Sequence, residues 1–184
     1  MSHPLLNLPR PLCKRLFWLS LVLTALSTLV LQLIDRALHS AAAPQGIVSY
    51  ELAGHAATAA KILASWDANA RLHAAFSLGF DHLYILAYVI TLTLAALGLA
   101  AAHSGIIRSI GIILAWGMGV AGLADVLENY LLWRMLILAP TETAAMTARW
   151  AALLKFTLIL LTFGYLVTIT LLNASRKMKK GHYT

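Results

Sequence analysis

Two acids and an amide lie inside an apolar, glycine-rich stretch, Trp116–Arg134. Asp125, Glu128 and Asn129 are three and four positions apart, so on a helix they share one face. A carboxylate at the centre of a membrane helix costs about 2.5–3.5 kcal/mol on insertion scales, and it normally faces the interior of a helix bundle. This face is therefore the starting point for a candidate functional site.

Two other apolar stretches carry polar side chains that could meet this face. In the first, polar residues recur at intervals of four, three and four, which is the spacing of a single helix face. They are Ser77, Asp81, Tyr84 and Tyr88. The second stretch holds Lys155, with apolar residues directly before and after it.

The predicted depths of these charges agree. Counted from the outer helix ends at about 1.5 Å per residue, Asp81 lies about nine residues in and Asp125 about thirteen. Glu128 lies about ten residues in and Lys155 about seven. We therefore expect one charge layer in the outer half of the membrane. Three carboxylates around one lysine leave an excess of negative charge unless a carboxylate is protonated or a cation binds.

The candidate site admits three interpretations. In the first, it binds or transports a small ligand, a cation or a lipid head group. In the second, Asp81 and Asp125 are the general acid/base pair of an enzyme that acts on a lipid or isoprenoid at the outer leaflet. In the third, the buried charges only fix the helix register of a structural or assembly subunit. The candidate ligand-binding residues are Asp81, Tyr84, Tyr88, Asp125, Glu128, Asn129 and Lys155.

The composition indicates the elements that position these residues. Of 184 residues, 60% are hydrophobic and only 11% are charged, against about 25% charged residues in soluble domains. A helix needs roughly 20 apolar residues to cross a bilayer core. The apolar segments that meet this length are residues 16–38, 72–101, 106–138 and 148–173. Residues 1–184 are thus predicted to be one all-α domain, a polytopic antiparallel bundle of four transmembrane helices.

Residues 49–66 form the only sizeable predicted extramembrane element. Leu52, Ala59 and Trp66 belong to an apolar edge, and Ser49 is positioned to cap the helix. We expect one extracytoplasmic amphipathic helix, either on the membrane surface or across the mouth of the bundle. It would act as a lid or as a plain connector.

The basic residues indicate the orientation. Arg10, Lys14 and Arg15 precede the first segment, and Arg108 lies in the turn between the second and third. Four more follow the last segment: Arg176, Lys177, Lys179 and Lys180. By the positive-inside rule, we expect both termini to be cytoplasmic. The tails, residues 1–15 and 174–184, would attract anionic lipid head groups.

Several other functions are not supported by the sequence. It contains no nucleic-acid motif, no helical His-x-x-x-His or Glu-x-x-His metal motif and no phosphate-binding loop. Because the last two segments lack histidine, a bis-histidine haem is not expected, and we predict no cofactor or metal. An Ala-x-Ala sequence ending at Ala43 resembles a signal-peptidase site, but the preceding apolar run is too long for a signal peptide and we expect no cleavage. A transporter this small would be a homo-oligomer.

Three motifs together resemble a known group of proteins. They are Asp81-His-Leu-Tyr84 with Tyr88, the run from Ala121 to Asn129 that reads Ala-Gly-x-x-Asp-x-x-Glu-Asn, and Lys155-Phe156. The chain resembles a group of uncharacterised bacterial four-helix inner-membrane proteins, and the resemblance extends to residues 62–66. It implies this architecture and this choice of residues, and it implies no activity.

Overall fold

The computed structural model describes residues 3–181, with side chains as far as residue 175. Within this range every regular element is a helix. The elements are the 3-10 turns η1 (Pro4–Asn7) and η2 (Arg36–Leu38), and the α-helices α1 (Arg10–Asp35), α2 (Ile47–Glu51), α3 (Ala56–Ser65), α4 (Ala68–Ala101), α5 (Gly105–Ile137) and α6 (Glu142–Gly181).

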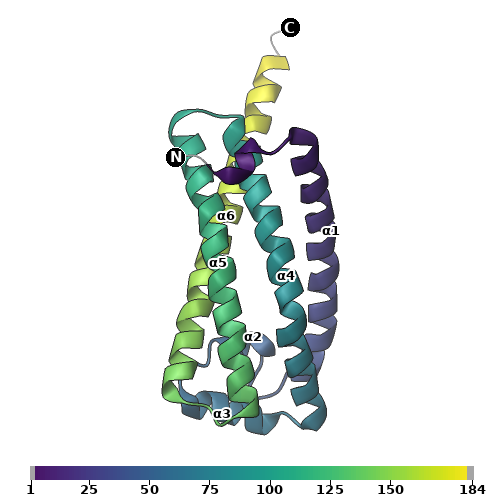
Figure 1. The fold of residues 1–184 in the computed structure, drawn as a ribbon, viewed down its shortest axis with the longest axis vertical. Helices are drawn as coiled ribbons and strands as arrows, with labels where there is room; N and C mark the ends of the chain where they lie inside the picture. Colours follow the sequence, from purple (N-terminus) through teal and green to yellow (C-terminus); the bar gives the residue numbers. More distant parts are fainter. Residues whose placement is uncertain (1–2, 182–184) are drawn as a thin grey trace.

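Four of these helices are long and apolar enough to cross a membrane: α1, α4, α5 and α6. This confirms the prediction of an all-helical protein with four helices of membrane-spanning length and hydropathy. Figure 1 shows the four helices along the long axis of the molecule, and the sequence colours run in alternating directions from one helix to the next. The helices extend beyond the predicted segments, since α1 begins at Arg10 inside the predicted tail and α6 continues through Gly181.

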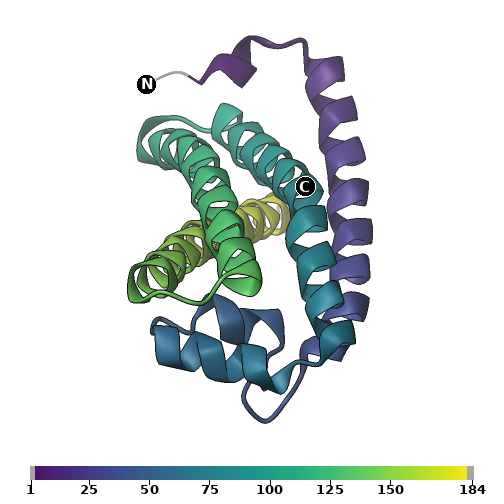
Figure 2. The same cartoon turned by 60° about the horizontal axis from the view of Figure 1, so that its bottom comes forward.

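The central helix is α4, which packs against α1 on one side and α5 on the other. Figure 2 shows α1 on the outer side of α4, away from α5. The contact between α1 and α4 is partly polar, because the hydroxyls of Ser20 and Thr24 lie 2.9 and 3.3 Å from the hydroxyl of Thr91. The outward face of α1 stays exposed, as expected for a helix surrounded by lipid.

The glycine-rich face of α5 makes close contact with its neighbours at particular positions. A Cβ atom on Gly122 would lie 2.9 Å from Cγ2 of Val89 on α4. A Cβ atom on Gly117 would lie 3.3 Å from a methyl group of Leu158 on α6. Gly119, in contrast, has nothing within 4 Å. Gly122 is therefore one position where the absence of a side chain allows α4 and α5 to approach, and Gly111 is another, since a Cβ atom there would lie 2.8 Å from Cβ of Ala100 on α4.

The segment predicted as one amphipathic helix over residues 49–66 is two helices, α2 and α3, and that prediction was wrong in this respect. The break follows α2, where Gly54 adopts a φ of +72° against the side chain of Arg149. Ser49 does not cap a helix; its hydroxyl accepts a hydrogen bond from the amide of Gln45. We call residues 39–67 the end cap, because α2 and α3 lie across one end of the long helices (Figure 2).

The end cap is held by hydrogen bonds to η2, α5 and α6. The Trp66 indole donates a 2.8 Å hydrogen bond to the carbonyl of Leu38, and the Tyr50 hydroxyl donates one of 3.1 Å to the carbonyl of Leu132 on α5. Glu142 of α6 accepts from the Ala56 amide at 2.8 Å and so caps α3 from outside that helix. The apolar side of the segment is therefore buried against protein rather than exposed to lipid.

Alanine substitutions at Gly122 and Gly119 should distinguish the contribution of helix packing to stability from the contribution of helix propensity. We expect Gly122→Ala to destabilise the protein by about 1–3 kcal/mol, because the new methyl group overpacks the contact with Val89. Gly119→Ala is the matched control and should be neutral or stabilising by up to about 1 kcal/mol, since alanine is the better helix former. Thermal unfolding in detergent micelles measures both. Equal shifts for the two variants would contradict this view of the α4–α5 contact.

Candidate functional site

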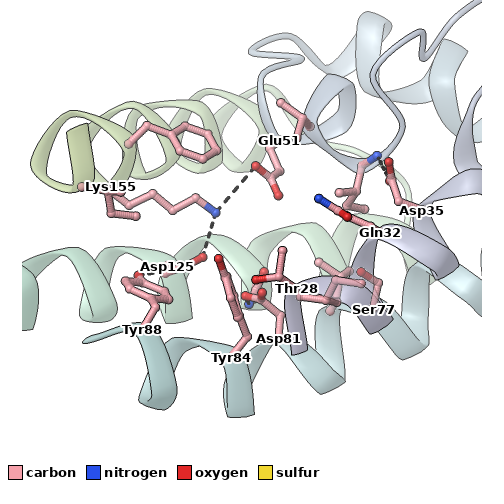
Figure 3. Close-up of a pocket in the computed structure, with 17 residues that line it drawn as sticks. Thr28, Gln32, Asp35, Glu51, Ser77, Asp81, Tyr84, Tyr88, Asp125 and Lys155 are labelled. Atoms are coloured by element: carbon pink, nitrogen blue, oxygen red, sulfur yellow. Dashed lines mark hydrogen bonds and ion pairs between the residues drawn. The ribbon is translucent and has the colours of Figure 1, made fainter. Parts of the chain in front are cut away.

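Lys155 of α6 is the centre of a buried charge cluster. Its Nζ atom donates a 2.8 Å hydrogen bond to Oδ1 of Asp125 and lies 2.9 Å from Oε2 of Glu128, both on α5. It also lies 3.6 Å from Oε2 of Glu51, on α2. The exposed fractions of the Lys155, Asp125 and Glu128 residues are 5%, 3% and 0%. Three carboxyl groups from two elements thus surround one ammonium group away from solvent, as Figure 3 shows for Glu51 and Asp125.

Asp125 also receives a hydrogen bond from α4. The Tyr88 hydroxyl donates to Oδ2 of Asp125 at 2.9 Å, so each carboxylate oxygen of Asp125 has one donor. The rings of Tyr84 and Tyr88 are one turn apart and tilted against each other, with centroids 5.3 Å apart. This arrangement extends the polar network from Lys155 across to α4.

Asp81 lies apart from this cluster. Its Oδ2 atom accepts a 2.6 Å hydrogen bond from the side-chain amide of Asn129. Within the described side chains, no lysine, arginine or histidine comes within ion-pairing distance of Asp81. The predicted layer of three acids around Lys155 is therefore present with a different member: Glu51 stands where Asp81 was expected.

Glu51 was not among the residues predicted for the site, because it lies outside the apolar segments. The α2 helix carries it into the bundle, where the Glu51 side chain is 10% exposed. The placement depends on Asp35 at the end of α1, whose Oδ1 atom accepts a 2.7 Å hydrogen bond from the amide of Ile47 (Figure 3). A sequence signal was available, since Ile47, Val48 and Tyr50 are apolar residues directly beside this acid.

The charges of the cluster do not balance if every acid is ionised. Both Glu128 carboxyl oxygens and Oε2 of Glu51 are buried without a hydrogen bond, although Lys155 is close to them. Burial raises the pKa of the Glu51 carboxyl above its ordinary value of 4.5, while the nearby Lys155 ammonium opposes the rise. Lys155 neutralises one carboxylate, so the remaining negative charge must be removed by protonation of a carboxyl group or by a bound cation, because isolated buried charges are very costly.

These groups border a cavity of about 340 Å³, which we call the carboxylate cavity. Its lining side chains come from α1, α2, α4, α5 and α6. The polar ones are Thr28, Gln32, Asp35, Glu51, Ser77, Asp81, Tyr84, Tyr88, Asp125, Asn129 and Lys155; the apolar ones are Leu31, Ile47, Val48, Leu78, Phe156 and Ile159. Figure 3 shows the labelled polar groups of α1 and α4 pointing toward the same space as Lys155.

Of the seven residues predicted for the site, six line this cavity, and Glu128 is buried behind Lys155. The structure brings Asp35, at the end of α1, to the cavity as well. His82 does not join them; its Nδ1 atom pairs with the carbonyl of Leu78 on its own helix. Among the described side chains, no group of three or more histidine, cysteine or acidic residues is arranged to hold a metal ion.

No protein-family model, curated protein or solved structure matches this chain. In the candidate site, Asp81 is hydrogen-bonded by the neutral amide of Asn129 and forms no ion pair with a described side chain. Asp125 accepts hydrogen bonds from the Tyr88 hydroxyl and the Lys155 ammonium group. Such a pair can hold a positively charged or hydroxyl-bearing group, or it can exchange a proton with one.

Removal of the central cation should be strongly destabilising. We expect Lys155→Met to lower the free energy of unfolding by about 3–5 kcal/mol, because it leaves buried carboxylates without their cation. Lys61→Met on the exposed face of α3 is the matched control and should change stability by less than about 0.5 kcal/mol. Thermal unfolding in detergent compares them. Adding Asp125→Asn and Glu128→Gln to Lys155→Met should restore part of the lost free energy of unfolding. A Lys155→Met protein as stable as the control would show that the acids carry no charge.

The raised pKa of Glu51 predicts a pH dependence of stability. In the unfolded chain Glu51 ionises near its ordinary pKa of 4.5, whereas the folded protein retains the proton to higher pH. Folding is therefore favoured by this group at low pH, and its contribution is lost as the pH rises above about 4.5. We expect Glu51→Gln to lessen the loss of thermal stability between acidic and alkaline pH. Parallel stability curves for the two proteins would contradict the assignment.

Proposed function

We propose that the four long helices form an antiparallel bundle in a bacterial inner membrane, with both termini in the cytoplasm. The basic residues Arg10, Lys14, Arg15 and Arg108 support this orientation. They belong to the end of the molecule that holds the start of α1 and the α4–α5 connection, and Figure 1 shows the C-terminal part of α6 at the same end. The end cap and the carboxylate cavity then lie in the outer half of the membrane.

The cavity, in this proposal, binds the polar group of an amphiphilic molecule. The supporting observation is its charge: Asp35, Glu51, Asp81 and Asp125 line it together with a single cation, Lys155. Asp81 has only the neutral amide of Asn129 as its described partner, which leaves a carboxylate available to a ligand. A cationic or hydroxyl-bearing head group would supply the missing donor, because hydrogen bonds to a charged acceptor are the stronger kind.

The position of the cavity favours a ligand with an apolar part. It lies between Leu31 on α1 and the pair Phe156 and Ile159 on α6. Figure 2 shows α1 along α4 and apart from α6, so the cavity lies between two helices that do not pack closely against each other. A head group could therefore reach the carboxylates from the membrane while its tail stays among apolar side chains.

A second candidate function is acid/base catalysis on such a molecule, for instance on a lipid or isoprenoid. The observation that favours it is the difference between the two aspartates. Asp125 is balanced by the Lys155 ammonium and the Tyr88 hydroxyl, whereas Asp81 is bound only by a neutral amide. Two carboxyl groups with unlike surroundings are the usual basis for separate acid and base roles. A purely structural role would explain the Lys155 cluster. It would not explain why Asp81 lines the cavity with only a neutral amide as its described partner.

Native mass spectrometry of the protein, extracted in mild detergent from its expression membranes, tests this proposal. We expect a bound amphiphile on the wild-type protein and at least about ten-fold lower occupancy on Asp81→Asn, since a charge-assisted hydrogen bond contributes roughly 1.5–3 kcal/mol. Thr162→Val is the matched control: Thr162 is buried on α6 against Met118 and lies outside the cavity. Its occupancy should equal that of the wild type.

The outcomes separate the candidate functions. A bound molecule that Asp81→Asn retains at wild-type occupancy would exclude Asp81 from the binding site. A folded wild-type protein that carries no ligand would favour the structural role of the cluster. Conversion of the bound molecule to a product of different mass, abolished by either Asp81→Asn or Asp125→Asn, would favour the enzyme.

A further inference from the structure

A second cavity lies on the membrane-exposed side of α1 and α4 and shares no residue with the carboxylate cavity. It is a groove of about 1060 Å³ between the first two thirds of α1 and the middle of α4. Apart from Lys14, Arg15 and Ser20, its lining side chains are apolar. Trp18 and Leu26 on α1 are more than half exposed there. The groove is thus open to the surroundings of the helices.

Basic side chains line one end of the groove, and apart from Ser20 the rest of its lining is apolar. Lys14 and Arg15 line it near the start of α1, and Leu26 lines it twelve residues further on. At 1.5 Å per residue the distance along α1 is about 18 Å, slightly more than half of a hydrocarbon core of about 30 Å. On the α4 side, the lining between Leu83 and Ile90 is apolar throughout. The groove therefore spans roughly one leaflet.

The two cations have no counter-charge in the described part of the chain. No aspartate or glutamate lines the groove, and no described acid forms an ion pair with Lys14 or Arg15. Both side chains are exposed. Trp18 lies one turn further along α1, at the depth where indole rings settle near lipid head groups. An anion at the basic end, attached to an apolar chain, would complement both parts of the groove.

We propose that this groove is a binding site for an anionic phospholipid. The phosphate group lies against Lys14 and Arg15, and one acyl chain follows the groove between α1 and α4. A second copy of the chain fits less well, because a two-fold axis along the membrane normal would bring the cations of both copies together at one depth. This site depends on the membrane-spanning helices and is independent of the function proposed for the carboxylate cavity.

Fluorescence quenching by brominated lipids tests the site, because Trp18 lines it. The full-length protein is reconstituted in phosphatidylcholine vesicles that contain an equal minor fraction of brominated phosphatidylglycerol or brominated phosphatidylcholine. We expect stronger quenching by the anionic lipid, and we expect Trp18→Phe to remove that difference. Lys14→Gln with Arg15→Gln should lower the relative affinity for the anionic lipid by at least about five-fold, the effect of roughly one surface cation.

The matched control is Arg10→Gln with Arg108→Gln. It removes two positive charges at the same end of the molecule, from residues that do not line the groove. This variant should keep the wild-type preference. Equal quenching of the wild-type protein by both lipids would overturn the proposal. So would an equal loss of preference in both double variants, because that result would indicate general surface charge rather than a site. Cross-linking of two copies through α1, with no quenching difference, would assign the groove to a second copy instead.

Discussion

The interior of this protein depends on the ion pairs that the ammonium group of Lys155 forms with buried carboxyl groups. A buried cation must be matched by acceptors, and here the acceptors come from α5 and from the end cap. The pairs with Asp125 and Glu128 join α6 to α5, while Glu51 joins both to α2. One side chain thus determines how three elements meet in a region where apolar packing alone would allow helices to slide.

The end cap shows how such a cluster can be completed by a short segment. Its two helices have no side-chain caps of their own, and their first amides are satisfied from outside, by Asp35 of α1 and Glu142 of α6. Because these acids belong to the long helices, the helices of the end cap are held by tertiary contacts rather than by caps of their own. Glu51 is consequently delivered to Lys155 by tertiary structure and not by its local sequence.

The carboxylate cavity and the groove beside Lys14 and Arg15 carry opposite charges, and they lie at different places on α1 and α4. The cavity gathers carboxyl groups around one cation and lies under the end cap. The groove presents two cations beside apolar side chains at the other end of α1. The position of α1, which packs on α4 and leaves the rest of its surface exposed, makes both possible. A helix fully enclosed by the bundle would have closed both spaces.

The sequence by itself determined the helices and most of the candidate site. Long apolar runs predict the four long helices because backbone groups in a membrane must be satisfied within the helix. The three-and-four spacing identified Asp81, Tyr84, Tyr88, Asp125 and Asn129, all of which line the cavity. Their role, like the side of the membrane that they face, remains a prediction.

Only the tertiary structure decided which acids meet Lys155. Glu51 lies 104 positions before Lys155 in the chain, and no local pattern connects them. The same holds for Gly54, where a side chain would meet Arg149, and for Gly122, which is buried against Val89 and Ile85 whereas Gly119 is exposed with nothing near it. Helical spacing reports the face of a residue on its own helix. The neighbour that this face meets depends on how separate helices rotate and pack, and local spacing does not record it.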